Sequence, residues 1–191
     1  METTFIDKAT AKAVGAILKS AQTHPKKQLG YAYLGRRGLT CSDGKRALRI
    51  HVEALDEKYG DFVRETGRVV VFSILKDALV QEREESYAES FLSTLDRVIP
   101  GDEAFRKNKP VGLYNPWGGP GYTQRESAAR FSDAMVADSI IVTQRAYDVS
   151  LFKDMDVRQW TELAPTHNGV HFRGADPDEA LVVLGMERRG S

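Results

Sequence analysis

The sequence has little of what marks a secreted, membrane-spanning or disulfide-bonded protein. Among its 191 residues there is a single cysteine, Cys41, which excludes an internal disulfide and a multi-cysteine zinc site. No apolar run approaches the ~20 residues that a membrane helix needs, and the N-terminus lacks the apolar core of a signal peptide. We therefore expect a cytoplasmic protein without a membrane span. The length fits one sizeable domain or two of about 95 residues.

Signatures of catalysis are also missing. There is no Gly-x-Ser-x-Gly segment. Gly38–Lys45 superficially resembles a phosphate-binding loop, but five residues separate its glycines and Arg46 stands where a magnesium-binding Ser or Thr belongs. His167 and His171 have the i, i+4 spacing of helical metal ligands, but Asn168-Gly169 would break a helix between them. We predict no enzyme activity, no cofactor and no metal.

Charge is balanced overall but unevenly distributed. The chain has 27 basic and 27 acidic residues. Residues 1–50 hold ten Lys/Arg against three Asp/Glu, a balance of +7, and residues 51–104 hold six against thirteen, a balance of −7. Such a dipolar chain can present a phosphate-facing surface without being basic as a whole, although scattered surface charge has the same appearance.

The clearest single element is an amphipathic helix over residues 8–21. At about 100° per residue, its apolar residues, including Val14 and Ile17, share one side. The three lysines Lys8, Lys12 and Lys19 fall together on the opposite side. The helix is expected to pack through its apolar stripe and to present three ammonium groups to solvent or to a ligand.

The remaining pattern alternates strands with helices. A second helix is expected over residues 74–84, with Lys76 and Arg83 pointing outward, and a third over Gln144–Met155. Gly38–Ile50 and Gly169–Val183 are loosely alike, which suggests a duplication whose halves meet near Leu95–Asp102. The expected strands are Thr3–Ile6, Gln28–Leu34, Leu39–Leu55, Gly67–Phe72, Ser139–Val142, Val157–Leu163, Gly169–Arg173 and Ala180–Met186. A loop around Trp117, rich in proline and glycine, has no clear assignment.

Three segments together resemble the bacterial sliding clamps, the beta subunits of replicative DNA polymerase. Ser42-Asp43-Gly44-Lys45-Arg46-Ala47 is similar to the family's Thr-Asp-Gly-His-Arg-Leu stretch. Thr94–Pro100 resembles the linker that leads into the clamp's last domain, and Leu181–Arg188 resembles its closing strand. All three occur in the family's order and at credible spacings.

The resemblance implies an α+β fold with helices on one face of antiparallel sheets. Two pseudo-repeated domains are expected, at residues 1–98 and 99–191. Because six such domains close a ring around duplex DNA, this chain would need three copies. The residues expected to face DNA without reading its sequence are Lys8, Lys12, Lys19, Lys26, Lys27, Lys76 and Arg83.

The same resemblance implies a pocket that receives short peptide tails of a DNA polymerase or other replication proteins. The positions carried over are Ser42, Gly44, Arg46, Pro100, Val182, Leu184 and Met186. Here Lys45 replaces the family's histidine, Ala47 a larger leucine and Gly185 a proline. These departures are expected to widen or loosen the pocket and to change partner specificity.

Two other functions remain open at this stage. The chain could be a clamp-fold regulator or decoy that binds replication proteins without closing a ring, or, less in keeping with its motifs, an unrelated α+β enzyme. The short form of the chain suggests a phage- or plasmid-borne processivity factor.

Overall fold

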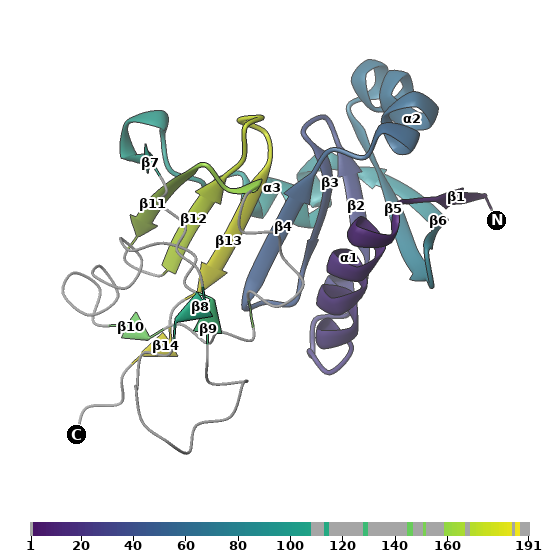
Figure 1. The fold of residues 1–191 in the computed structure, drawn as a ribbon. Helices are drawn as coiled ribbons and strands as arrows, with labels where there is room; N and C mark the ends of the chain where they lie inside the picture. Colours follow the sequence, from purple (N-terminus) through teal and green to yellow (C-terminus); the bar gives the residue numbers. More distant parts are fainter. Residues whose placement is uncertain are drawn as a thin grey trace.

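A computed structural model describes residues 2–107, 113–114, 128–129, 145–146, 151, 159–166, 169–184 and 186–187. The described residues form one antiparallel sheet of ten strands, with two helices packed against one of its faces (Figure 1). The α+β class, with helices on one face of an antiparallel sheet, is therefore as predicted. No helix in the described part of the chain is long and apolar enough to cross a membrane.

The sheet runs in the order β1-β6-β5-β2-β3-β4-β13-β12-β11-β7. Its N-terminal strands are β1 (Thr3–Phe5), β2 (Ala32–Gly35), β3 (Gly38–Ser42), β4 (Arg46–Ile50), β5 (Arg68–Leu75) and β6 (Ala78–Ser86). Its C-terminal strands are β7 (Arg106–Lys107), β11 (Glu162–Thr166), β12 (Gly169–Arg173) and β13 (Ala180–Leu184). Two short pairs lie outside it: β8 (Leu113–Tyr114) with β9 (Ala128–Ala129), and β10 (Arg145–Ala146) with β14 (Met186–Glu187).

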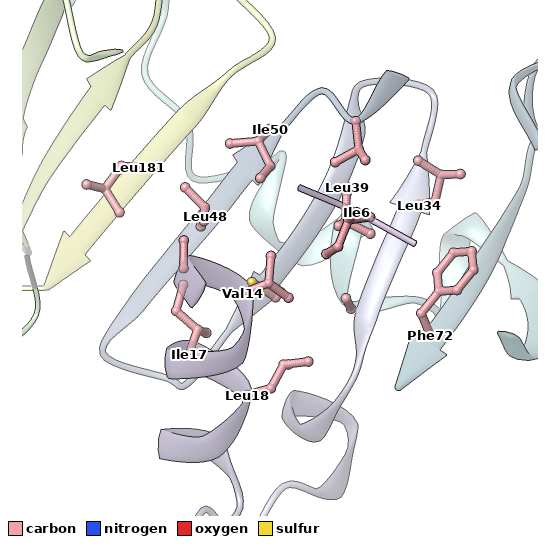
Figure 2. Packing of buried hydrophobic residues seen from close by; sticks show 14 of the residues in the cluster. Ile6, Val14, Ile17, Leu18, Leu34, Leu39, Leu48, Ile50, Phe72 and Leu181 are labelled. Carbon is pink, nitrogen blue, oxygen red and sulfur yellow. The ribbon is translucent and has the colours of Figure 1, made fainter. Parts of the chain in front are cut away.

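The helices α1 (Lys8–Ala21) and α2 (Glu53–Thr66) share one face of the sheet. Val14, Ile17 and Leu18 of α1 point at the inward residues of β3 and β4, as Figure 2 shows. Leu55 and Val63 of α2 belong to the same buried cluster. Burial of these aliphatic side chains attaches both helices to the sheet, at about 1.5–3 kcal/mol for each fully buried side chain.

The opposite face carries a smaller apolar layer. There the short helix α3 (Phe91–Leu95) places Leu92 against Tyr33, Val69 and Val71, which alternate along β2 and β5 with the residues that face α1 and α2. Three single-turn helices complete the connections: η1 (Lys27–Gly30), η2 (Tyr87–Glu89) and η3 (Asp102–Ala104).

The prediction of a helix over residues 74–84 is wrong. β5 continues to Leu75, Lys76 takes a left-handed conformation with φ 58°, and β6 returns from Ala78. The extended stretch expected over Leu39–Leu55 is in fact the β3–β4 hairpin followed by the start of α2, a helix that the sequence reading missed. The strand expected from Gln28 begins only at Ala32, after η1.

In the C-terminal half, Gly169–Arg173 forms β12 as predicted, and most of Ala180–Met186 forms β13. The strand expected at Val157–Leu163 begins only at Glu162. Within the helix expected at Gln144–Met155, the described Arg145–Ala146 form strand β10 instead. The strand expected at Ser139–Val142 and the Trp117 loop lie outside the described residues.

A seam between β4 and β13 joins the two halves of the chain. Ala180 to Val183 pair with Arg49 to Arg46, so the two loosely similar segments form neighbouring hairpins, β3–β4 and β12–β13. The main buried cluster contains Leu48 from one half and Leu163, Phe172 and Leu181 from the other. The division into domains 1–98 and 99–191 stays a prediction.

Candidate functional site

One candidate site is the lysine face of α1. Lys8, Lys12 and Lys19 are all exposed, and the buried residues of the helix lie on its other side. Asp7 fixes the start of the helix, because its Oδ1 accepts hydrogen bonds from the backbone N–H groups of Ala9 (2.9 Å) and Thr10 (3.0 Å). The helix therefore presents three ammonium groups on a rigid scaffold, with no acidic residue among positions 8–21.

The other residues expected to face DNA do not gather with these lysines. Lys26 and Lys27 are exposed, but Lys26 lines a cleft described below. Lys76 occupies the β5–β6 turn instead of a helix. Arg83 lies on β6 opposite Val71, and its guanidinium stacks 4.7 Å from the centre of the Tyr31 ring. Since Val71 packs on the face away from α1, Arg83 does not extend the lysine face.

The second helix on the same face has the opposite charge. α2 contains five acidic residues and only Lys58 and Arg64 as basic ones. Its carboxylates belong to Glu53, Asp56, Glu57, Asp61 and Glu65. The surface presented by the two helices is thus divided into a basic and an acidic half.

A second candidate site is a cleft of about 340 Å³ that we call the seam cleft. Its walls come from three parts of the chain that are distant in sequence: the β3–β4 turn, the α3 region and β13. Five residues that the sequence assigned to a peptide pocket line it together: Ser42, Gly44, Arg46, Val182 and Leu184.

Hydrogen bonds inside the β3–β4 turn shape the floor of the cleft. The buried carboxylate of Asp43 accepts from the backbone N–H groups of Lys45 (3.0 Å) and Arg46 (2.9 Å), and the Ser42 hydroxyl donates to the Arg46 carbonyl (2.8 Å). Gly44 has φ +84°, and a β-carbon there would come within 3.0 Å of His24 Nε2. The backbone conformation therefore favours glycine, and a β-carbon would also require the His24 ring to shift slightly.

Arg46 lines the cleft, but its side chain is only 6% exposed. Its Nε donates to Asp43 at 3.2 Å and its Nη1 to the Leu151 carbonyl at 2.6 Å. A buried guanidinium with these partners holds the turn in place, and a contact of Arg46 with a bound peptide stays a prediction.

The apolar part of the cleft is half buried and half open. Ala47, Leu95 and Val182 form a small buried cluster, whereas Leu184 is 41% exposed and Val98 is 56% exposed at the rim. The backbone N–H of Leu184 donates to the Lys45 carbonyl at 2.8 Å, which fixes the end of β13 against the turn. Exposed aliphatic side chains beside a ready-made hollow suit an apolar peptide side chain.

Of the other two expected pocket residues, one lies elsewhere and the side chain of the other is not described. Pro100 lines a separate cavity that also contains His171. Met186 lies in β14, and its side chain is outside the described part of the chain.

Several residues that line the cleft were not predicted from the sequence. Phe91, Leu95 and Val98 recur at i, i+4 and i+7, which is the spacing of one helical face, and all three line the cleft. This periodicity could have identified the three residues as one face of a helix. His24 and Leu29, which close the other side, carry no comparable pattern.

Two buried titratable groups outside these sites have shifted pKa values. Burial raises the pKa of the Cys41 thiol to about 12 and lowers the pKa of His171 to about 4. Ligand atoms of His51, Asp176 and Asp178 lie within 4.8 Å of one another, a spacing that could hold a metal ion. However, Asp178 also pairs with Arg37 Nε at 3.2 Å, and His51 Nε2 is 3.4 Å from Asp176. His167 lies outside the described residues.

No family model matches the sequence, and a search of the curated proteins finds no match. Two solved structures to which the chain is similar are beta subunits of DNA polymerase III. One is a putative subunit from Eubacterium rectale, at 12% identity and a TM-score of 0.43, covering 98% of this chain and 66% of that one. The other is from Pseudomonas aeruginosa, at 12% identity and a TM-score of 0.37, covering 98% and 67%. The chain thus spans about two thirds of their length, and the likeness concerns general architecture alone.

Proposed function

We propose that this protein is a non-enzymatic sliding clamp, a processivity factor that encircles duplex DNA and captures the peptide tails of a DNA polymerase or other replication proteins. The observation that carries the proposal is the seam cleft. Five residues chosen from the sequence for their resemblance to the clamp pocket line one hollow with apolar walls: Ser42, Gly44, Arg46, Val182 and Leu184.

The lysine face of α1 supports the DNA-binding half of the proposal. Ammonium groups attract phosphates regardless of base sequence, and the attraction weakens as salt is added. A sliding protein needs that property, because base contacts worth about 1–3 kcal/mol each would hold it in place. With two domains per chain, ring closure would take a homotrimer.

A second function is favoured by the acidic helix α2. Five carboxylates on the same sheet face as the lysines would repel the phosphates of an encircled duplex. This arrangement suits a clamp-fold regulator or decoy that binds replication proteins through the seam cleft and forms no ring.

The first experiment is the mass in solution, by light scattering behind a sizing column over a range of concentrations. A discrete trimer supports the clamp. A second assay then compares retention on circular and linearised duplex DNA, and a clamp should stay on the circle and slide off the linear form. A monomer at every concentration overturns the ring and leaves the regulator.

The seam cleft is tested separately by titrating a fluorescent peptide with the sequence of a bacterial replicative polymerase tail. Leu184→Asp should abolish binding, since it places a charge at the apolar rim. Leu75→Asp is the matched control, because Leu75 is 65% exposed and does not line the cleft. Equal affinity of both variants and the unaltered protein would remove the peptide site.

A further inference from the structure

A separate cavity of about 520 Å³ contains Val69 and Leu92 of the apolar layer around α3, and it reaches Gly67 at the C-terminal end of α2. Its lining comes from the β2–β3 turn, the start of β5 and the η2–α3 segment. We call it the arginine pocket after four of its lining residues: Arg36, Arg37, Arg49 and Arg68. It does not include the residues of the seam cleft or the lysine face.

The innermost arginine is already neutralised. Arg49 has a side chain only 3% exposed, donates from Nε to the Thr40 hydroxyl at 3.2 Å, and bonds to the carboxylate of Asp96. Asp96 also accepts a hydrogen bond from the Tyr87 hydroxyl. Among the described residues Asp96 is the one carboxylate that lines the pocket, against four guanidiniums. Its charge is shared mainly with Arg49, so positive charge remains in excess among the lining residues.

Those three outer arginines are held only loosely. Arg36 donates to the carbonyl of Arg64 at 3.1 Å, and no carboxylate contact is found for it among the described residues. Arg37 and Arg68, with side chains 54% and 50% exposed, contact Asp178 at 3.2 Å and Glu84 at 3.9 Å, and neither of these carboxylates lines the pocket. Arg37 also lies 4.0 Å from Asp96, at the outer limit of an ion pair. Such exposed pairs contribute little to stability, so a doubly charged anion can replace them.

The rest of the pocket suits a flat ring beside that anion. Tyr87 is 41% exposed at the pocket wall. Gly35, Gly38 and Gly67 contribute no side chains, and Gly38 and Gly67 have φ +107° and +65°. An exposed aromatic ring next to guanidiniums is the combination by which proteins hold single nucleotides and unpaired strands: bases stack and phosphates pair with arginine.

We propose that the arginine pocket binds a nucleotide, with its phosphate between Arg36, Arg37 and Arg68 and its base against Tyr87. The nucleotide is either a free nucleoside monophosphate or one unit of single-stranded DNA. This site lies on the opposite face of the sheet from the lysines of α1, so it is independent of the function proposed above.

The test is calorimetric titration of the full chain with dTMP, with a dT hexamer and with inorganic phosphate at low salt. The unaltered protein should bind the first two. The double variant R37S/R68S should weaken both by about tenfold or more, because it removes two charged donors. Arg64→Ser is the matched control: Arg64 is an exposed arginine paired with Asp61 outside the pocket, and its loss should leave affinity within about twofold.

Tyr87→Leu separates stacking from charge. It should weaken dTMP and the hexamer by about tenfold while phosphate affinity stays the same. A much higher affinity for the hexamer than for dTMP identifies single-stranded DNA as the ligand. Equal affinity identifies the free nucleotide. The proposal fails if the unaltered protein binds neither probe, if Arg64→Ser weakens binding as much as the double variant, or if a hexaglutamate peptide displaces dTMP at the same concentration as the dT hexamer does.

Discussion

Helices α1 and α2 are each 14 residues long and pack on the same face of the same sheet, yet they present opposite charges. Their inward faces are buried to the same extent: Ile17 of α1 and Leu55 of α2 are both fully buried in one cluster. Their outer faces are not constrained by packing, so the charge found there reflects what each helix meets outside. The comparison teaches that one half of this face is fit for a polyanion and the other half is not.

The largest expected effect comes from reversing the α1 charges. The triple variant K8E/K12E/K19E should lower duplex DNA affinity by about a hundredfold or more at low salt, and should reduce the slope of log K against log [salt] by about 3. Fluorescence anisotropy with a labelled duplex measures both. An unchanged affinity in a protein that melts normally would contradict the assignment of α1 to DNA.

Reversing charge on α2 sharpens the contrast. Glu57→Lys with Glu65→Lys, both exposed positions, should raise duplex affinity by about threefold to tenfold if the two helices face the same DNA. No gain, measured in the same assay, would mean that α2 lies away from the duplex and would favour the regulator over the ring.

In their cores the two helices should behave alike. Ile17→Ala and Leu55→Ala each leave a cavity against the sheet and should lower the free energy of unfolding by about 2–5 kcal/mol. Urea denaturation followed by circular dichroism measures the loss. Lys19→Ala, on the exposed side of α1, should change it by less than about 0.5 kcal/mol. A loss below 1 kcal/mol at one core position alone would show that its helix is only loosely attached.

The smallest effects concern the residues that cap the two helices, at the start of α1 and at the end of α2. α1 has a side-chain cap at its start, Asp7, whereas α2 ends on Gly67 with φ +65°. Asp7→Ala should cost about 1 kcal/mol, and Gly67→Ala about the same, because alanine disfavours that left-handed conformation. Thermal melts of the two variants, with Asp7→Asn as a control that retains a capping side chain, check both values.

The Asp7 cap also predicts a pH dependence. Hydrogen bonds from Thr10 and from backbone N–H groups hold the pKa of this carboxyl below its ordinary value. Its contribution to stability is therefore complete above the ordinary Asp pKa of about 4 and is lost as the pH falls through the lower folded value. Melts between pH 2 and 7 should show a smaller pH slope for Asp7→Asn than for the unaltered protein, and equal slopes would contradict the assignment.

How far the sequence predicts this fold depends on the element. α1 is predicted to the residue, because its apolar spacing is regular. α2 was missed, although Leu55, Tyr59 and Val63 repeat every four residues and Gly67 follows the helix. The helix over 74–84 was wrong because β6 gains its conformation by pairing with β5, a long ladder that local propensity does not contain.

The seam cleft shows a similar division. Ser42, Gly44, Val182 and Leu184 were proposed from short motifs, and the β4–β13 pairing is what brings the two motifs together. Arg46 was chosen as a contact residue, but its role depends on Asp43 and on the carbonyl of Leu151, 105 positions away. A sequence motif identifies such a residue; the direction of its side chain depends on neighbours that only the fold supplies.

The seam also has a consequence for synthesis of the chain. β4 ends at Ile50, and its partner β13 begins at Ala180. While the 129 residues between them are being made, the N-terminal strands can already pair, yet β4 presents an unsatisfied row of N–H and C=O groups. Because such an edge readily pairs with other chains, the nascent protein is most exposed to aggregation until β13 is complete.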